Sequence, residues 1–345
     1  MFAINPGSTS TEVGYFENNN SIWIHKFDHT SEDLSENIID QLTFRNDCIK
    51  PYIGIEQLDA VVSRGGLLKP LVSGVYKISE KMLTDLRIGE YGIHASNLGA
   101  LLAFPIAQKW SVSAFIVDPI TSDDFPPVAR ISGVPGIERK SRSHALNIKY
   151  CYYKQCNDNN LESKDGRFII CHFGSGFSIA AVVGGKIIDV NDALLGMGPF
   201  SVERAGALPL ASILSLAYNR KLSQKESEKL LTKESGLAGY LGTNDFREIE
   251  KRLQKNDSQA QLVFDGMLYQ ISKEMGACLA VLKGQCDGII LTGGLTQSEH
   301  FVNNLKERIS FAGDITVYPG SFELEALASG AERVLNHSEQ AKIYQ

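Results

Sequence analysis

Paired cysteines and cysteine–histidine clusters are missing from this sequence. Its six cysteines form no C-x-x-C motif, and no set of Cys and His residues has the spacing of a zinc site. Cys171 and Cys278 lie within apolar runs, so both thiols are expected in the core. A disulfide scaffold and a structural zinc site are therefore not expected, and the expected location is the reducing cytoplasm.

Long apolar runs and basic blocks are missing as well. No apolar stretch approaches about 18 residues, and no basic segment precedes an apolar one at the N-terminus, so neither a membrane span nor a signal peptide is expected. The 34 basic residues are outnumbered by 40 acidic ones, and positive charge bunches only at residues 139–144. Nucleic acids and membranes are therefore not expected as partners.

Two common nucleotide-binding motifs are also absent. Residues 136–141 end in Lys-Ser, but no glycine precedes Lys140, so they do not form a P-loop. Residues 174–176 read Gly-Ser-Gly, but Ile179 stands where a dinucleotide fingerprint has glycine. If the chain binds a nucleotide, it does so with other elements.

What the sequence does contain is an internal repeat. An apolar run at residues 2–4, a Gly-containing turn and two alternating runs predict three antiparallel strands, and the same order returns from residue 168. Residues 59–67 are echoed by residues 287–295, and both segments contain Gly-Gly after an apolar strand. In a chain of 345 residues this predicts a duplicated α/β domain, with mixed sheets flanked by helices.

A polar connector at residues 154–166 is expected to separate the two copies. The predicted domains are residues 1–155, joined by a C-terminal helix at 322–345, and residues 156–321. Apolar spacing and end signals predict further helices at residues 31–46 (opened by Ser31), 79–87, 96–110, 140–154, 201–219, 246–255 (capped by Asp245) and 258–283 (opened by Ser258).

The turn after the first strand carries more polar side chains than a solvent turn needs. Asn5, Ser8 and Ser10 lie beside Gly7. Two interpretations stay open: a phosphate-binding turn, in which backbone N–H groups approach an anion, or a polar hairpin tip. Two interpretations also stay open for Gly293-Gly294, because a glycine pair after a strand fits either a nucleotide-binding site or a turn that needs positive φ.

Six short motifs follow one another along the chain: residues 5–10 (Asn-Pro-Gly-Ser-Thr-Ser), 61–66 (Val-Val-Ser-Arg-Gly-Gly), 94–99 (His-Ala-Ser-Asn-Leu-Gly), 117–119 (Val-Asp-Pro), 198–204 (Gly-Pro-Phe-Ser-Val-Glu-Arg) and 240–245 (Tyr-Leu-Gly-Thr-Asn-Asp). This ordered set resembles the acetokinase family, and most of all its butyrate kinase branch. The resemblance implies a duplicated actin-like (ribonuclease H-like) fold with an ATP cleft between the domains. It also implies ATP with Mg²⁺, reversible phosphorylation of a short-chain fatty acid to an acyl phosphate, and at least a homodimer through the second domain.

The resemblance implies a role for each matching residue. Arg64 and Arg204 are expected around the substrate carboxylate and the transferred phosphoryl group. His172 and His94 are expected close to the phosphate and the substrate, and Asp118 and Glu323 are expected to hold Mg²⁺. The residues expected to bind the nucleotide are Asn5, Ser8, Ser10, Gly174, Ser175, Gly176, Gly293 and Gly294.

The chemistry of such a reaction explains the choice of side chains. A carboxylate is already ionised at pH 7, so the nucleophile needs no general base. The protein has to cancel the repulsion between two anions and align them, and guanidinium groups suit both anions.

Structural roles remain as alternatives for these residues: an ion pair with Glu203 for Arg204, a core position for His172, a helix cap for His94, a first-turn charge for Glu323 and an Asp-Pro turn for Asp118. The chain also departs from the butyrate kinase pattern at residues 172–176, at Leu195 and Met197, and at Ser321. These departures leave the preferred acid open. They also keep two other functions open, an acetate or propionate kinase and a non-catalytic actin-like ATP-binding module.

Overall fold

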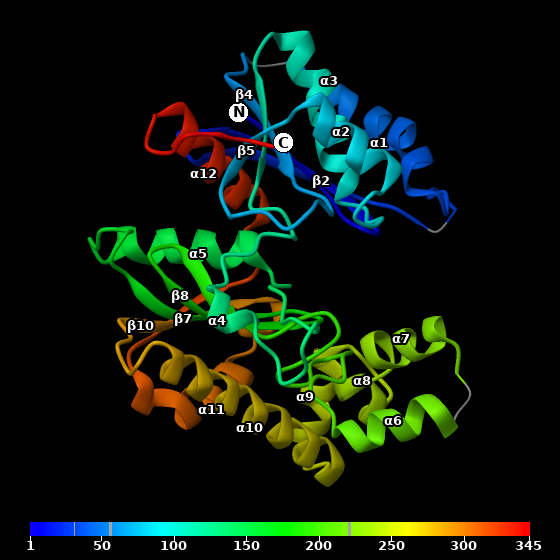
Figure 1. Cartoon of the computed structure of the whole chain (residues 1–345), viewed down its shortest axis with the longest axis vertical. Helices are drawn as coiled ribbons and strands as arrows, with labels where there is room; N and C mark the ends of the chain where they lie inside the picture. The colour runs from blue at the N-terminus through cyan, green and yellow to red at the C-terminus, as the bar shows by residue number, and fades with distance from the viewer. Residues whose placement is uncertain (31, 55–56, 220–221) are drawn as a thin grey trace. The chain divides into compact units, whose positions relative to one another are not determined.

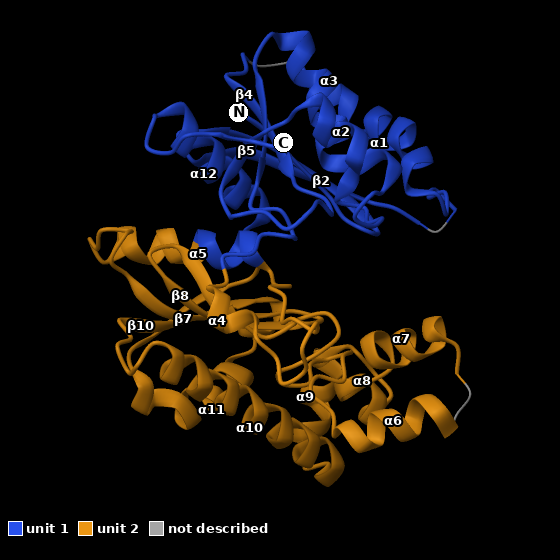
Figure 2. Ribbon diagram, viewed as in Figure 1, with its two compact units in different colours: residues 1–124, 145–150, 322–345 blue, residues 125–144, 151–321 orange. Residues whose placement is uncertain are grey.

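The computed structural model describes residues 1–30, 32–54, 57–219 and 222–345, which form two compact units (Figures 1 and 2). Unit 1 comprises residues 1–124, 145–150 and 322–345, and unit 2 comprises residues 125–144 and 151–321. The sequence predicts a domain boundary after residue 155. In the structure the chain passes from unit 1 to unit 2 after residue 124, returns to unit 1 at residue 145, and leaves it again inside a helix, between residues 150 and 151.

The described part of unit 1 contains a seven-stranded mixed sheet with the order β12-β5-β6-β4-β1-β2-β3. Its strands are β1 (Phe2–Pro6), β2 (Ser10–Glu17), β3 (Asn20–Asp28), β4 (Ala60–Arg64), β5 (Val75–Lys77), β6 (Ser113–Val117) and β12 (Lys342–Ile343). Its helices are α1 (Gln41–Ile49), α2 (Glu80–Ile88), α3 (Asn97–Trp110), α12 (Glu323–Leu335) and the short 3₁₀ turns η1 (Ile38–Asp40) and η2 (Lys50–Tyr52).

Strand alternation gives this sheet two apolar faces. Phe2 and Ile4 of β1 pack in the cluster that contains α3, whereas Ala3 packs in the cluster that contains α12. Accordingly α3 contacts β1, β4 and β6 on one face, and α12 contacts the same three strands on the other (Figure 1). The ends of β1 and β4 are therefore held between helices on both sides.

The described part of unit 2 contains a five-stranded sheet with the order β11-β10-β7-β8-β9. Its strands are β7 (Arg167–Phe173), β8 (Phe177–Val183), β9 (Lys186–Val190), β10 (Gly288–Gly293) and β11 (Ile315–Pro319). Its helices are α4 (Pro127–Arg130), the second part of α5 (Ala145–Asp158), α6 (Leu210–Asn219), α7 (Gln224–Lys233), α8 (Gly236–Leu241), α9 (Phe246–Gln254), α10 (Ser258–Val281), α11 (Glu299–Ile309), η3 (Gly294–Gln297) and η4 (Ser310–Ala312). The apolar side of α10 covers the sheet and forms the core with it.

The duplication that the sequence predicts is confirmed by strand pairing. In unit 1, β1 pairs antiparallel with β2 and parallel with β4, with Ile4 opposite Ser63. In unit 2, β7 pairs antiparallel with β8 and parallel with β10, with His172 opposite Thr292. The order β6-β4-β1-β2-β3 in unit 1 thus matches β11-β10-β7-β8-β9 in unit 2.

Several predicted helices are confirmed, and others begin later than expected. Helices α2, α3, α9 and α10 lie where the sequence predicts them, although Asp257 rather than Ser258 caps α10. The helix expected over residues 31–46 starts as a 3₁₀ turn at Ile38, and its expected opening residue Ser31 lies outside the described residues. Helix α5 begins at Ala145 rather than at residue 140.

The helix expected over residues 201–219 begins only at Leu210. Residues 201–208 instead form a loop, closed by hydrogen bonds from Ser201 N to Arg204 O and from Ala207 N to Gly198 O. Gly206 has a φ of +63° within this loop, a conformation that a continuing α-helix excludes. Within residues 1–30, 32–54, 57–219 and 222–345, no helix has the length and apolar character that a bilayer crossing requires.

Gly99 allows α3 to lie close to the end of β4. A methyl group at this position would overlap the carbonyl oxygen of Arg64 and touch Ser63. We expect Gly99→Ala to lower the free energy of unfolding by about 1–3 kcal/mol, because neither backbone can move without disturbing the sheet. Urea unfolding followed by circular dichroism measures this.

The matched control for this substitution is Gly276→Ala in α10. No atom lies within 4 Å of a methyl group at Gly276, so alanine should stabilise the helix there by about 0.5–1 kcal/mol. Equal unfolding midpoints for the two variants would contradict the proposed close approach of α3.

Candidate functional site

The turn after β1 is closed by its backbone and leaves two serines at its rim. Gly7 N donates to Ser10 O at 2.8 Å, Ser8 is exposed and Ser10 is half-buried. Asn5 lies deeper, and its side-chain amide donates to Glu12 Oε2 at 3.0 Å and to Glu323 Oε2 at 2.7 Å. Three residues of this turn were predicted to contact phosphate. Ser8 and Ser10 lie at its rim, whereas the Asn5 side chain is already hydrogen-bonded to two carboxylates.

Arg64 lies at the end of β4, beside the same carboxylate. Its Nη1 donates to Glu323 Oε2 at 2.7 Å and lies 3.5 Å from Asn5 Oδ1, and the Arg64 and Glu323 side chains are 23% and 21% exposed. Three residues selected for different roles, Asn5, Arg64 and Glu323, therefore form one cluster in unit 1. Asn147 fixes the start of α12, where Glu323 lies, because its Oδ1 accepts from Phe322 N at 2.9 Å.

His94 lies close to this cluster and also shapes the start of α3. Its Nδ1 accepts from Ser96 N at 3.2 Å and lies 2.8 Å from Ser96 Oγ, so the turn before the helix uses this nitrogen. Burial, and after it the positive charge of Arg64, hold the pKa of His94 below its ordinary value, while Glu323 opposes them. His94 is therefore not the cap of α3, because Ser96 holds that position, and its Nδ1 instead supports Ser96; the lowered pKa favours the neutral ring.

Asp118 does not join Glu323 in any described contact. It is buried, and its Oδ1 accepts from Gly74 N at 2.7 Å and pairs with Lys149 Nζ at 2.9 Å. Lys149 also donates to Ser73 Oγ at 2.6 Å. Asp118 has a φ of +38°, an uncommon conformation for aspartate that matches the predicted Asp-Pro turn.

The described residues contain no cluster of three or more His, Cys, Asp or Glu side chains that could hold a metal ion by themselves. This arrangement is compatible with Mg²⁺, which binds to few carboxylates and keeps several waters. Glu323 fits such a role better than Asp118, since both of its hydrogen bonds fall on Oε2, whereas Lys149 already compensates the charge of Asp118.

In unit 2, His172 is the last residue but one of β7, the first strand of the second hairpin, and it stacks on a second histidine. The rings of His144 and His172 lie 4.0 Å apart at 13°. His144 Nδ1 lies 2.8 Å from Ser178 Oγ, and His172 is 5% exposed. Neither His144 nor Lys149 was expected from the sequence, in which His144 stands out only by the bunching of positive charge at residues 139–144.

Arg204 is folded against Gly176, in the turn of the second hairpin. Its Nη1 donates to Ala193 O, and a methyl group at Gly176 would overlap the guanidinium. Burial lowers the pKa of Arg204, while Glu203 and Asp192 oppose this shift. The alternative of an ion pair with Glu203 is wrong, because Glu203 instead lies 3.7 Å from Lys233 and accepts from Asn244 at 2.7 Å.

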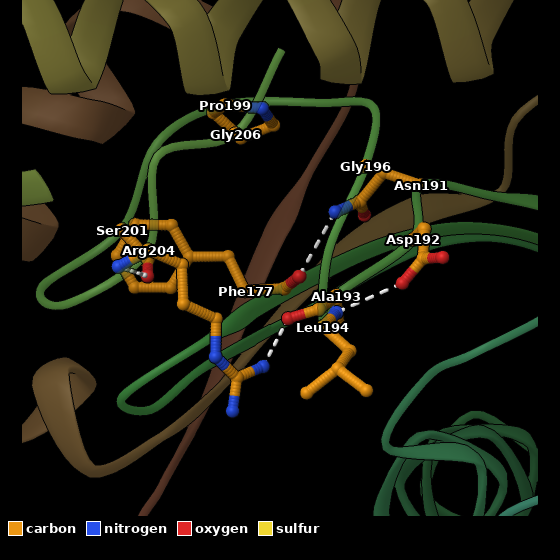
Figure 3. A pocket seen from close by; sticks show the side chains of 10 residues that line it. All are labelled: Phe177, Asn191, Asp192, Ala193, Leu194, Gly196, Pro199, Ser201, Arg204 and Gly206. Atoms are coloured by element: carbon orange, nitrogen blue, oxygen red, sulfur yellow. Dashed lines mark hydrogen bonds between the residues drawn. The ribbon is translucent and has the colours of Figure 1, made fainter. Parts of the chain in front are cut away.

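One atom of Arg204 lacks a partner. Nε is buried and has no hydrogen-bond partner among the described residues. The side chain borders a hollow of ≈ 10 Å³ that Asp192, Leu194 and Ser201 also line, with room for about one water molecule (Figure 3). A buried donor without an acceptor is rare, and a water molecule in this hollow would satisfy it.

Gly293 and Gly294 serve different purposes. Gly293 has a φ of +97°, and a methyl group there would overlap the backbone of Phe173, so the turn itself requires glycine. Gly294 is exposed, and nothing lies within 4 Å of a methyl group at its Cα. The structural interpretation therefore accounts for Gly293, and Gly294 leaves open space at the start of η3.

Comparison with solved structures identifies the fold class. Porphyromonas gingivalis acetate kinase has a TM-score of 0.74 with 20% identity, over 97% of this chain and 99% of that chain. A propionate kinase from Francisella tularensis subsp. tularensis SCHU S4 has a TM-score of 0.75 with 18% identity, over 94% and 97%. The chain therefore has the actin-like fold of these kinases, as expected.

The family follows from sequence comparison. The acetokinase family matches residues 135–340. A curated relative, "Probable butyrate kinase 2" from Caldanaerobacter subterraneus subsp. tengcongensis, is 44% identical over 351 residues, which covers 100% of this chain and 99% of the relative. The chain belongs to the acetokinase family, and it is a carboxylate kinase, a phosphotransferase with a carboxyl group as acceptor.

The neutral state of His94 makes stability depend on pH. In the unfolded chain His94 binds a proton below about pH 6.5, whereas in the folded chain its lowered pKa delays protonation to lower pH. The free energy of unfolding therefore keeps the full contribution of His94 above about pH 6.5 and loses it as the pH falls. We expect the loss of stability between pH 7.5 and 5.5 to be smaller in His94→Gln than in the wild type, measured by urea unfolding.

The control for this measurement is His337→Asn, because His337 is exposed after the end of α12. That variant should keep the wild-type dependence. An unchanged pH dependence in His94→Gln would show that His94 takes up its proton equally in both states.

Proposed function

We propose that this carboxylate kinase transfers the γ-phosphoryl group of ATP to a short-chain fatty acid, with butyrate or a branched relative as the preferred acid. The observation that carries the proposal is the 44% identity, over the whole chain, to a relative described as a probable butyrate kinase. The cluster of Arg64, Asn5 and Glu323 supports it, because it holds a guanidinium at a strand end where an anion can approach.

The transfer would be direct and in line. A carboxylate oxygen attacks the γ-phosphorus, the bond to the β,γ-bridging oxygen breaks, and ADP leaves with the electron pair. Arg64 and Arg204 would compensate the negative charge of the two reactants, and His172 would donate a hydrogen bond to the phosphoryl group. The half-buried position of Arg204 supports this role, since a guanidinium acts more strongly on an anion where water is partly excluded.

The remaining assignments concern the nucleotide and its metal. Mg²⁺ would compensate charge on the phosphates of ATP, and Glu323 and Asp118 would hold it, directly or through water. Ser8 and Ser10 in unit 1, and the backbone of Gly174, Ser175, Gly176 and Gly294 in unit 2, would donate to phosphate oxygens. Asn5 would act by orienting Glu323, and His94 would contact the substrate through Nε2, because Ser96 occupies Nδ1.

A hydroxamate assay tests the proposed function. Hydroxylamine traps an acyl phosphate, and a panel of C2 to C6 acids is incubated with the protein, ATP and Mg²⁺. We expect product that requires acid, ATP and metal, with the highest kcat/KM for butyrate or a branched acid. A preference for acetate or propionate would replace the proposed acid, and bound ATP without product from any acid would leave a non-catalytic module.

Two arginine variants extend this assay to the proposed mechanism. Arg64→Ala and Arg204→Ala should each lower kcat/KM by at least about 10²-fold without loss of the folded state. Arg308→Ala, which removes an exposed arginine of α11, should keep wild-type activity. Near-normal turnover in Arg64→Ala or Arg204→Ala would refute the role given to that residue.

We further propose that the protein forms a homodimer or a higher homo-oligomer through unit 2. Helix α6 has no buried residue, and Leu210, Leu214 and Tyr218 on one of its faces are 79%, 58% and 80% exposed. Three large apolar side chains at a spacing of four residues form a continuous stripe, which a second copy of the chain would cover. We also propose a cytoplasmic location, because none of the six cysteines forms a disulfide.

Light scattering coupled to size exclusion tests the oligomer. The wild type should elute as a dimer or a larger species, and the double variant Leu210→Glu/Leu214→Glu should be a monomer, since the stripe would then carry charge. Ser212→Glu/Ser215→Glu, on the same helix away from the stripe, is the control that should leave the mass unchanged. A monomeric wild type would refute the oligomer, and a dimeric Leu210/Leu214 variant would exclude α6 as its interface.

A further inference from the structure

A buried arginine lies behind the turn that follows β1. Arg45, in the middle of α1, is completely buried. Its Nη1 donates to Ser10 O at 2.8 Å and to Thr11 Oγ1 at 2.8 Å, and its Nε and Nη2 donate to Gln41 Oε1 at 3.1 and 2.9 Å. The guanidinium thus joins α1 to the two residues at which the turn enters β2.

All of these partners are neutral. Among the described residues, Arg45 hydrogen-bonds only these neutral groups and forms no ion pair, and burial lowers its pKa. Arginine stays protonated in proteins, so Arg45 carries a positive charge that no carboxylate of the described part of unit 1 pairs with. A buried charge is costly when nothing compensates it, and an apolar side chain of similar volume would fill the space at lower cost.

The contacts of Arg45 coincide with the bonds that close the turn. Ser10 O, which accepts from Arg45, also accepts from Gly7 N at 2.8 Å. Thr11 Oγ1 lies 2.8 Å from His29 Nε2, and His29 N donates to Thr9 O at 2.8 Å. Arg45 of α1 and His29, directly after β3, therefore fix the buried side of residues 7–11, while Ser8 stays exposed to solvent.

We propose that Arg45 is a positioning residue for the phosphate groups of the nucleotide: it fixes the carbonyl that closes the turn at residues 7–10, and its uncompensated charge makes that turn attractive to a polyphosphate anion. The proposal rests on the proposed function, because it takes the turn to face the phosphates. The phosphate supplies the negative charge that the described protein residues around Arg45 do not provide. Arg45 itself stays buried and touches no substrate.

Binding of ATP and of inorganic tripolyphosphate to the full chain, measured by calorimetry, tests this inference. Arg45→Met and Arg45→Gln remove the charge, and both should weaken the two ligands about ten-fold, the effect of one unit charge acting on an anion across a short stretch of protein. Arg45→Lys keeps the charge and should recover most of the affinity. In turnover, KM for ATP should rise in the uncharged variants while KM for the acid stays within about two-fold of the wild type.

Ile49→Ala is the matched control, because Ile49 is buried one turn further along α1, where it packs in the apolar core and carries no charge. It should lower thermal stability and leave both dissociation constants unchanged. If Arg45→Gln binds ATP and tripolyphosphate as tightly as the wild type, or if Arg45→Lys is as weak as Arg45→Gln, the charge has no role and the inference falls. A wild type that binds ATP but phosphorylates no acid would refute the proposed function, and the binding series would still decide the role of Arg45.

Discussion

The parallel pairing of the first strand of each hairpin with a later strand is the constraint on which this structure depends. β1 and β4 run side by side in one direction, as do β7 and β10, so the segments that follow them leave the sheet at the same edge. In unit 1 this puts Asn5 and Arg64 next to each other, although 59 residues separate them. Asn5 and Arg64 in unit 1 and His172 in unit 2 therefore lie at or next to the end of a buried strand.

Charge is arranged around that edge in two different ways. At the rim, Glu323 accepts from Arg64 and Asn5, in a position where a ligand could exchange with these partners. Further inside, Asp118 and Lys149 neutralise each other with side chains that are 2% and 5% exposed. A partly exposed pair rearranges at smaller cost than a buried one, so Arg64 and Glu323 suit direct exchange with a ligand, whereas Asp118 and Lys149 hold their loops in one geometry. Arg45 belongs to neither arrangement, since its hydrogen-bond partners are neutral groups.

Local pattern predicted the elements well where a single signal decides the backbone. Ser79 before α2 and Asp245 before α9 cap the predicted helices, and the alternation of residues 168–183 became the β7–β8 hairpin. The prediction was wrong for residues 201–208, where apolar spacing suggested a helix. There Gly206 adopts positive φ and the loop closes on Gly198, a contact that no local periodicity reveals. The late start of α1 has a similar cause, because a 3₁₀ turn capped by Asn37 precedes it.

The sequence by itself determined the duplicated α/β architecture, the acetokinase family and which polar residues lie at strand ends, because repeats, turns and motifs are local properties of the chain. Only the tertiary structure decided the partners of those residues. In the folded chain Arg64 forms an ion pair with Glu323, and Asp118 forms one with Lys149. His172 stacks on His144, and Arg45 is buried next to the first turn. Such partners come from segments as far apart as 259 residues, and their contact depends on how helices pack on the sheet, which no spacing along the chain encodes.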